Sequence, residues 1–243
     1  MTAPQPARRS GRAKSTTASH RPDRSIPTTI WAAGTDPTQA TAGWPIPVVS
    51  RAVTEFSHSK AKVILLDWPT HPFGSHRNSD AHRSRRTSND VAAVVESLDR
   101  TVTVIDAASA SGVWVAASCG GADLVITNPT PEHHDLNAGD SIAAAAAALL
   151  CEAGVLVVLT HSLTTSRGEL VDPTSHVVAA AQGADLLYLQ HIVAVPIRED
   201  TVLAAAPDFE TLTPMPVHRR IHTDVLVFLQ PHDFQAGNPG LPA

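Results

Sequence analysis

The chain has 243 residues, of which 43% are hydrophobic and 4% aromatic, and its formal net charge is −5. This composition favours helices packed on a sheet over a β-sandwich, and the acidic balance argues against indiscriminate nucleic-acid binding. The longest apolar run, Ile142 to Leu150, is about half of a membrane span, and the N-terminus lacks an apolar signal-peptide core. We therefore expect a cytoplasmic protein that makes no membrane contact.

Basic residues gather in two segments of this acidic chain. Residues 1–26 combine arginines with prolines, serines and threonines and contain almost nothing to bury, which predicts a disordered basic arm. Residues 76–90 show no apolar periodicity, which predicts a basic surface loop, and residues 231–243 are expected to be a disordered tail. The expected contacts with DNA phosphates come from the arm and from four arginines, Arg77, Arg83, Arg85 and Arg86. The alternative is that both segments are solvated and bind nothing.

Residues 27–230 alternate strand and helix signals, which is typical of an α/β fold with a doubly wound, mostly parallel sheet and helices on both faces. Short apolar runs predict strands at 62–67, 101–106, 113–117, 122–128, 155–160, 185–195, 201–205 and 224–228. Capping residues and small apolar residues predict helices at 91–98, from 140 or 141 to 150 or 151, and from 173 or 174 to 182. Gly154 and Gly183 are expected to end the second and third of these helices.

One predicted strand ends on a polar amide. Leu124 to Ile126 form a short apolar run typical of a central parallel strand. Pro129 and Pro131 cannot donate hydrogen bonds to a neighbouring strand, so the strand must end at Asn128. Open α/β sheets bind ligands at the carboxyl ends of their strands. Asn128 is therefore a candidate binding residue.

The segment Asn128-Pro129-Thr130-Pro131 resembles the Asp/Asn/Ser-Pro-Pro-aromatic motif of amino methyltransferases, which use S-adenosylmethionine to methylate exocyclic amines of DNA bases. Thr130 stands in place of the second proline and Pro131 in place of the aromatic residue. Other segments follow in the order typical of actinobacterial members, namely Thr29-Ile30-Trp31, Gly43-Trp44-Pro45, 152–158, 168–172 and 222–228. This ordered series implies a Rossmann-like methyltransferase fold and a DNA substrate.

The resemblance assigns catalysis to positioning of the substrate amine. The Asn128 side-chain oxygen would accept one hydrogen bond from the amine and the carbonyl beside Pro129 a second, directing the nitrogen lone pair at the methyl group. Family members stack an aromatic ring on a flipped base, and here Pro131 offers only a small apolar face. His133 and His134 could replace that ring, or they could be solvent-facing loop residues.

The cofactor turn departs from the family pattern. Members carry a glycine-rich Asp-Pro-x-x-Gly-x-Gly-Thr-Thr turn after the first strand, whose glycines allow close backbone approach to the ligand. Asp67 is in place here, but His71 and Phe73 stand where glycines are expected, and only Gly74 is near. Asp106, at the end of the next strand, could bind the ribose hydroxyls, or it could cap a helix, as Asp67 could cap a loop. The resemblance thus implies an S-adenosylmethionine site whose affinity is weak or lost.

Metal and thiol chemistry find little support in the sequence. The histidines show no helical His-x-x-x-His pair with a third ligand, and His218 and His222 are expected to be polar surface residues before a strand. Cys119 and Cys151 lack metal-like spacing and are expected to be reduced thiols. We expect no metal site.

Two functions follow from the sequence. The first is S-adenosylmethionine-dependent methylation of an exocyclic amine of a nucleic-acid base, in DNA. The second is a catalytically degenerate relative that keeps the fold and serves as a DNA-associated or partner-binding protein. The glycine-poor turn distinguishes them, because the first function requires S-adenosylmethionine to bind there and the second does not.

Overall fold

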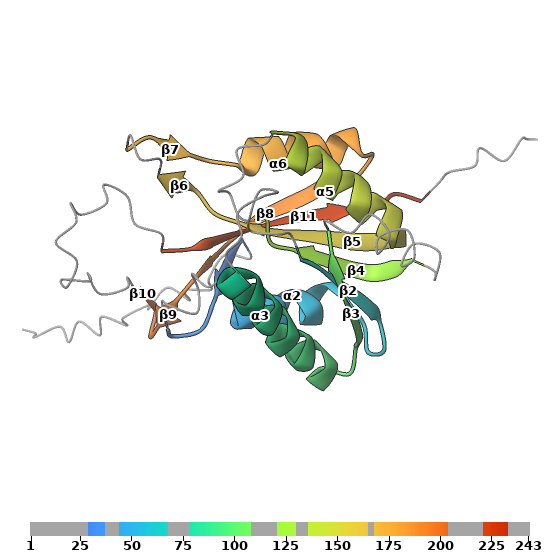
Figure 1. The fold of residues 1–243 in the computed structure, drawn as a ribbon. Coiled ribbons are helices and arrows are strands. Elements are labelled where there is room, and N and C mark those ends of the chain that lie inside the picture. Colours follow the sequence, from blue (N-terminus) through green and yellow to red (C-terminus); the bar gives the residue numbers. More distant parts are fainter. Residues whose placement is uncertain are drawn as a thin grey trace, which may run out of the picture.

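The computed structural model describes residues 29–36, 44–67, 78–107, 121–129, 136–164, 168–203 and 221–232, with only the backbone described for 78–87, 136–138 and 163–164. The main sheet contains seven strands (Figure 1), namely β1 (Ile30–Ala32), β2 (Lys62–Asp67), β3 (Thr101–Asp106), β4 (Ala122–Thr127), β5 (Leu150–Thr160), β8 (Leu187–Val195) and β11 (Thr223–Leu229). Four helices are described, α2 (Ile46–Phe56), α3 (Asn78–Ser97), α5 (Leu136–Leu149) and α6 (Thr174–Gly183).

The strands lie in the order β1-β8-β11-β5-β4-β2-β3. Neighbouring strands are parallel, except that β11 runs antiparallel to both β5 and β8. β11, the last of the described strands along the chain, therefore lies inside the sheet, where its residues from Thr223 to Phe228 are buried. The predicted architecture, a mostly parallel Rossmann-like sheet, is confirmed.

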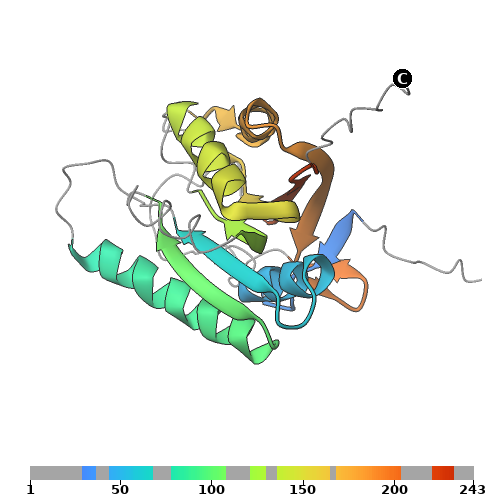
Figure 2. The same cartoon turned by 90° about the vertical axis from the view of Figure 1, so that its right-hand side faces the viewer.

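Helices cover both faces of the sheet, as predicted. Figures 1 and 2 show α5 and α6 on one face and α2 and α3 on the other. Alternate residues of β2 serve the two faces, with Val63 and Leu65 in the cluster under α2 and α3, and Ile64 and Leu66 in the cluster under α5 and α6. All four are 0% exposed. The continuous apolar run in β2 thus reflects burial on both faces.

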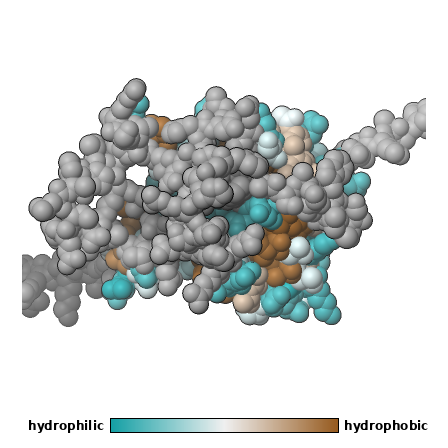
Figure 3. Space-filling view, viewed as in Figure 1, coloured by the Kyte–Doolittle hydropathy of each residue, from teal (hydrophilic) through white to brown (hydrophobic). Residues whose placement is uncertain are grey.

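Some apolar residues are exposed at one edge of the described sheet. In the space-filling view (Figure 3), apolar residues are visible to the right of centre, on the side where β2, β3 and β4 lie in Figure 1. Among the described strands β3 is the last on that side, and its Val104 is 38% exposed. In the part of the chain that the structure describes, no helix is long and apolar enough to cross a membrane.

The predicted basic loop at 76–90 is wrong from Asn78 onward, because α3 begins there and continues to Ser97. Residues 78–90 contain neither proline nor glycine. Val91 and Val95, both 0% exposed, anchor the second half of the helix on the sheet. Once a helix has nucleated, each further residue costs little, so the polar half of the helix can extend from the anchored half.

The helix predicted to begin at Asp140 or Ser141 begins at Leu136 instead and ends at Leu149. Gly139 lies inside it, where a Cβ atom would come 3.6 Å from the Cβ of Ala180 in α6. The glycine thus lies inside the helix, beside α6, and does not precede the helix. The added Cβ would make an ordinary van der Waals contact, so the packing of the two helices does not itself require glycine at this position.

Gly154 does not end that helix either, because β5 already begins at Leu150. A Cβ atom on Gly154 would lie 2.8 Å from the carbonyl oxygens of both Ala122 and Cys151. The register between β4 and β5 shifts next to this point. The glycine therefore permits a close approach of backbones at an irregular strand start.

The predicted strand at 201–205 is not part of the main sheet. Thr201–Val202 forms β10, which pairs with β9 (Ile197–Arg198) in a separate hairpin. Glu199 and Asp200 both have positive φ angles, 48° and 66°, and turn the chain back on itself. A second short pair consists of β6 (Leu163–Thr164) and β7 (Leu170–Val171). The helix predicted at 173–182 is confirmed as α6.

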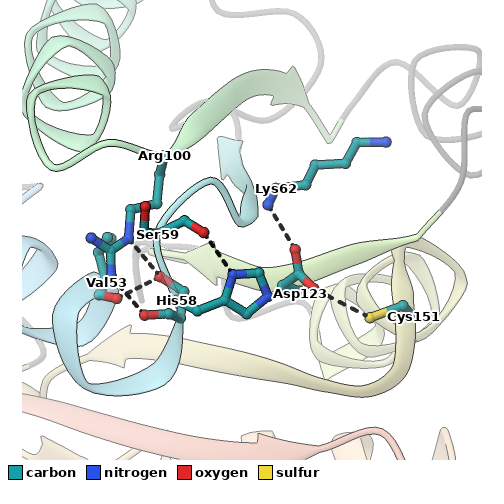
Figure 4. A network of polar contacts seen from close by, with 8 residues as sticks. Val53, His58, Ser59, Lys62, Arg100, Asp123 and Cys151 are labelled. Atoms are coloured by element: carbon teal, nitrogen blue, oxygen red, sulfur yellow. Dashed lines mark hydrogen bonds and ion pairs between the residues drawn. The ribbon is translucent and has the colours of Figure 1, made fainter.

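The amino edge of the sheet is fixed by polar contacts to backbone groups (Figure 4). The Lys62 amide, at the start of β2, donates to Oδ2 of Asp123 at 2.7 Å. The Arg100 guanidinium donates to the carbonyls of Ser57 and Leu98, which joins the end of α2 to the turn before β3. Because these contacts lie at the amino edge, they leave the opposite edge for a ligand.

Candidate functional site

Three predicted site residues lie together at the carboxyl edge of the sheet. Asp67 is the last residue of β2, Asp106 the last of β3, and Asn128 follows the last residue of β4. Asp67 and Asp106 are direct partners in the parallel register of β2 and β3, and the Ala107 amide donates to the Asp67 carbonyl at 2.8 Å. The two carboxylate residues therefore occupy neighbouring strand ends.

This edge contains a topological switch point. Along the chain these four parallel strands come in the order β2, β3, β4, β5. In the sheet they lie side by side in the order β3, β2, β4, β5. The order thus reverses between β2 and β4. Open α/β sheets bind ligands in the crevice at such a reversal. Asp67 and Asn128 are the residues at the carboxyl ends of the two strands that flank it.

Asp67 is held by a helix that the sequence did not connect to it. The Ser88 hydroxyl, on α3, donates to Oδ2 of Asp67 at 2.7 Å. Ser88 is 1% exposed. A short hydroxyl-to-carboxylate hydrogen bond is stronger than one between neutral groups. The Asp67 carboxylate is therefore fixed from the α3 face of the sheet.

Asn128 is largely buried, with 9% of its surface exposed. The preceding Thr127 donates its hydroxyl to the Leu66 carbonyl at 3.0 Å, which joins β4 to β2 just below the site. No hydrogen bond joins the Asn128 side chain to another residue in the described part of the chain. Its amide is therefore available to a ligand at this edge.

Other predicted site residues lie outside the described residues. They include Gly74 with His71 and Phe73 of the cofactor turn, Thr130 and Pro131 of the amide motif, the alternative ring residues His133 and His134, and Arg77. The basic arm, residues 233–243 of the tail, the predicted strand at 113–117 and Cys119 also lie outside. Arg83, Arg85 and Arg86 lie on α3, where only the backbone is described.

A second polar cluster, absent from the predicted site, lies on the α6 face at the start of β11. Asp224 accepts a hydrogen bond from Nε2 of His191 at 2.8 Å, and Nε2 of His222 lies 3.4 Å from its other oxygen. Burial alone would raise the pKa of Asp224, but hydrogen bonds from His222 and His191 outweigh it and hold the pKa below its ordinary value. Thr160, the register partner of Asp224, is 1% exposed, and its hydroxyl has no hydrogen-bond partner among the residues that the structure describes.

His222 was interpreted from the sequence as a polar surface residue, and the structure gives it a buried carboxylate partner. Its side chain is 35% exposed, whereas that of Asp224 is 7% exposed. The signal in the sequence was the acidic residue Asp224 inside a strand that is otherwise apolar from Val225 to Phe228. A buried carboxylate needs a donor, and two histidines supply it here.

The described cysteine shows no sign of reactivity. Burial and the nearby Asp123 carboxylate raise the pKa of the Cys151 thiol, so the neutral form dominates. Its Sγ atom lies 4.0 Å from Oδ1 of Asp123, at the amino edge (Figure 4). Among the described residues no group of three or more histidine, cysteine, aspartate or glutamate side chains could hold a metal ion.

Comparisons with known proteins give structural likenesses only. No known family matches the chain, and no curated protein does. The O-methyltransferase family protein of Burkholderia thailandensis is 15% identical, over 77% of this chain and 55% of that one, with a TM-score of 0.41. N-methyltransferase NodS of Bradyrhizobium japonicum WM9 is 10% identical, over 78% and 94%, with a TM-score of 0.39. Precorrin-6y C5,15-methyltransferase of Geobacter metallireducens GS-15 is 10% identical, over 82% and 98%, with a TM-score of 0.42.

These three TM-scores lie below 0.5. No activity transfers from those proteins to this chain. Its function has to be inferred from its own residues.

Proposed function

We propose that this chain is an S-adenosylmethionine-dependent methyltransferase that acts on an exocyclic amine of a nucleic-acid base, with DNA as the substrate. The observation that carries the proposal is Asn128, a largely buried amide without a hydrogen-bond partner among the described residues, at a strand end beside the switch point and followed by Pro129. Buried polar groups are normally hydrogen-bonded, so an amide that no described residue pairs with fits a ligand partner. The ordered segments that resemble amino methyltransferases favour this reaction among those of the fold.

The neighbouring carboxylates suit the cofactor. Asp67 and Asp106 can accept hydrogen bonds from ribose hydroxyls or from an ammonium group, both of which S-adenosylmethionine carries. Their adjacent strand ends bring two acceptors to one side of the switch point, with Asn128 on the other. When bound, S-adenosylmethionine supplies an electrophilic methyl group. The donor set at this edge therefore fits both a cofactor and an amine substrate.

Asn128 then acts as a hydrogen-bond acceptor for the substrate. Its side-chain oxygen takes one N–H of the amine, and the adjacent backbone carbonyl before Pro129 takes the other. Two fixed acceptors orient the nitrogen lone pair, and rate enhancement rests on positioning. Proline at 129 restricts the backbone on which both acceptors lie.

A methyl-transfer assay tests this proposal. The full chain is incubated with S-adenosylmethionine labelled in its methyl group and with unmethylated duplex DNA, single-stranded DNA or RNA. We expect label on an exocyclic amine of a DNA base. Transfer to RNA alone would change the substrate, and transfer to none of the nucleic acids would contradict the proposed function.

Cofactor affinity is expected to be weak. Glycines normally let the backbone approach the ligand after the first strand, and His71 and Phe73 stand at those positions in the sequence. Isothermal titration with S-adenosylmethionine should therefore give a Kd above the low micromolar range. A low-micromolar Kd for the unmodified chain would show that these side chains do not obstruct the turn.

The second candidate function is a DNA-associated relative without methyl transfer, favoured by the same two bulky residues. In this case the basic arm and the arginines Arg77, Arg83, Arg85 and Arg86 would contact phosphates without reading sequence. Arg83, Arg85 and Arg86 lie within α3. If the chain binds DNA but transfers no methyl group in the methyl-transfer assay, this second function is supported over the first.

Changing Arg83, Arg85 and Arg86 together to alanine should weaken DNA binding at low salt. Each phosphate contact releases counterions, so loss of three contacts lowers the slope of log Kd against log salt concentration by roughly 2 to 3. Fluorescence anisotropy at several salt concentrations measures this slope on DNA of two unrelated sequences. The effect should be equal on both sequences. Binding that is indifferent to the triple substitution would exclude these arginines from DNA contact.

A further inference from the structure

Ser88 occupies a position at which the helix otherwise carries apolar residues. It lies on the sheet-facing side of α3 with Val91 and Val95, three and seven residues further on. Ser88 is 1% exposed and both valines are 0% exposed. A hydroxyl buried at such a place is costly unless it is hydrogen-bonded. The Ser88 hydroxyl donates to the Asp67 carboxylate at the switch point.

Asp67 itself is only partly buried, so solvent could satisfy its carboxylate without help from a helix. As the last residue of β2, it precedes a segment that leaves the sheet, and several side-chain rotamers could point its oxygens elsewhere. The 2.7 Å hydrogen bond from Ser88 favours the rotamer that directs Oδ2 toward α3. The hydroxyl therefore contributes to the orientation of this carboxylate as well as to its solvation.

We propose that Ser88 is a positioning residue of the cofactor site, which holds the Asp67 carboxylate in the orientation that binds S-adenosylmethionine. This inference rests on the proposed function. Ser88 does not touch the cofactor and acts through Asp67. A fixed carboxylate does not lose side-chain entropy when the ligand binds, which raises affinity compared with a mobile one.

A double-mutant cycle on cofactor affinity tests this role. The isotope-labelled full chain is titrated with S-adenosylmethionine, and the NMR signal of the Ala107 amide, which donates to the Asp67 carbonyl, reports local binding. Ser88→Ala should raise Kd about tenfold, the effect of losing one charge-assisted hydrogen bond. In an Asp67→Asn background the same substitution should change Kd little, because residues that act through one another are not additive.

Two further variants separate positioning from stability. Ser88→Thr keeps the hydroxyl and should bind with an affinity close to that of the unmodified chain. Ser97→Ala is the matched control, since Ser97 lies on the same helix but is exposed and bonds only to the Val94 carbonyl. Thermal unfolding of each variant shows whether it is folded at the titration temperature.

The outcomes distinguish a failure of the proposed cofactor site from a failure of the proposed role of Ser88. Absence of any signal change when the unmodified chain is titrated would contradict the cofactor site and Ser88 with it. Binding by the unmodified chain with an unchanged Kd for Ser88→Ala would overturn the role of Ser88 alone. An equal loss in the presence and absence of the Asp67 carboxylate would also overturn it, because Ser88 would then not act through Asp67.

Discussion

Replacement of Asn128 with alanine should lower the rate of methyl transfer by roughly 100-fold or more, while the affinity for S-adenosylmethionine stays unchanged. The lost amide oxygen is an acceptor for the substrate amine, and no described residue depends on it for a hydrogen bond. Fold stability should therefore change little. The measurements are kcat for label transfer to DNA, cofactor affinity by titration, and the unfolding midpoint in urea.

Asn89→Ala provides the matched control, because Asn89 is an exposed asparagine on α3 and its loss should leave all three quantities as they are. Asn128→Asp keeps an oxygen acceptor of similar size and should retain part of the activity. An unreduced kcat for Asn128→Ala would remove this residue from the mechanism. A simultaneous loss of cofactor affinity would indicate that Asn128 binds the cofactor rather than the amine.

The central strands were predictable because their sequences carry the signal of burial on both faces. β2 has the predicted bounds and is buried from Val63 to Leu66, and β4 ends at Thr127, directly before Asn128 and Pro129. β3 also has the predicted bounds, although it lies at the edge of the described sheet and is mostly exposed. A run of four to six apolar residues followed by a polar residue and a strand breaker has few other interpretations. Since parallel strands end at one edge, Asp67, Asp106 and Asn128 could be placed together before their register was known.

Elements that depend on tertiary packing, rather than on a pattern in their own residues, could not be predicted. The first half of α3 has no apolar periodicity and depends on the anchored second half. Gly154 was expected to end a helix, yet it lies inside β5, beside the carbonyl of Ala122. A glycine placed for close packing looks the same in the sequence as a glycine placed for a helix end.

The candidate site was predictable in its strand-end residues and not in the partners of those residues. Ser88 and Asp67 are 21 residues apart, and His191 and Asp224 are 33 apart. No local pattern joins such pairs, because a helix position and a strand end meet only through the packing of the sheet. Histidine directly before a strand is also common in solvated segments. For this reason His222 was interpreted as a surface residue.

Asp224 is expected to make the largest polar contribution to stability among the described side chains that the sequence did not single out. Its carboxylate lies in the interior strand β11, bonded to His191 and close to His222. Asp224→Asn removes the charge but keeps the shape, and should lower the free energy of unfolding at pH 7 by roughly 2–4 kcal/mol. The two histidines are each about one third exposed, so water can solvate them after the change, which limits the loss.

Urea unfolding at pH 7 measures this difference, and Asp140→Asn, a change of an exposed aspartate on α5, is the matched control. The control should unfold at the same urea concentration as the unmodified chain. A stability of Asp224→Asn equal to that of the control would show that the two hydrogen bonds contribute nothing net. If the Asp224→Asn chain does not fold at pH 7, His191→Leu takes its place, because leucine removes one donor and should lose about half as much.

The contribution of Asp224 to the free energy of unfolding should depend on pH in a direction that its pKa determines. Because the pKa of Asp224 is lower in the folded chain than in the unfolded one, its contribution is fully present above the unfolded value of about 4. It is lost as the pH falls through the folded value, since protonation removes the acceptor for the histidines. The unfolding free energies of the unmodified chain and of Asp224→Asn should therefore differ most near neutral pH and converge at acidic pH. If the difference stays constant down to pH values below 3, roughly one unit under the ordinary pKa, then the loss comes from altered packing and not from the charge.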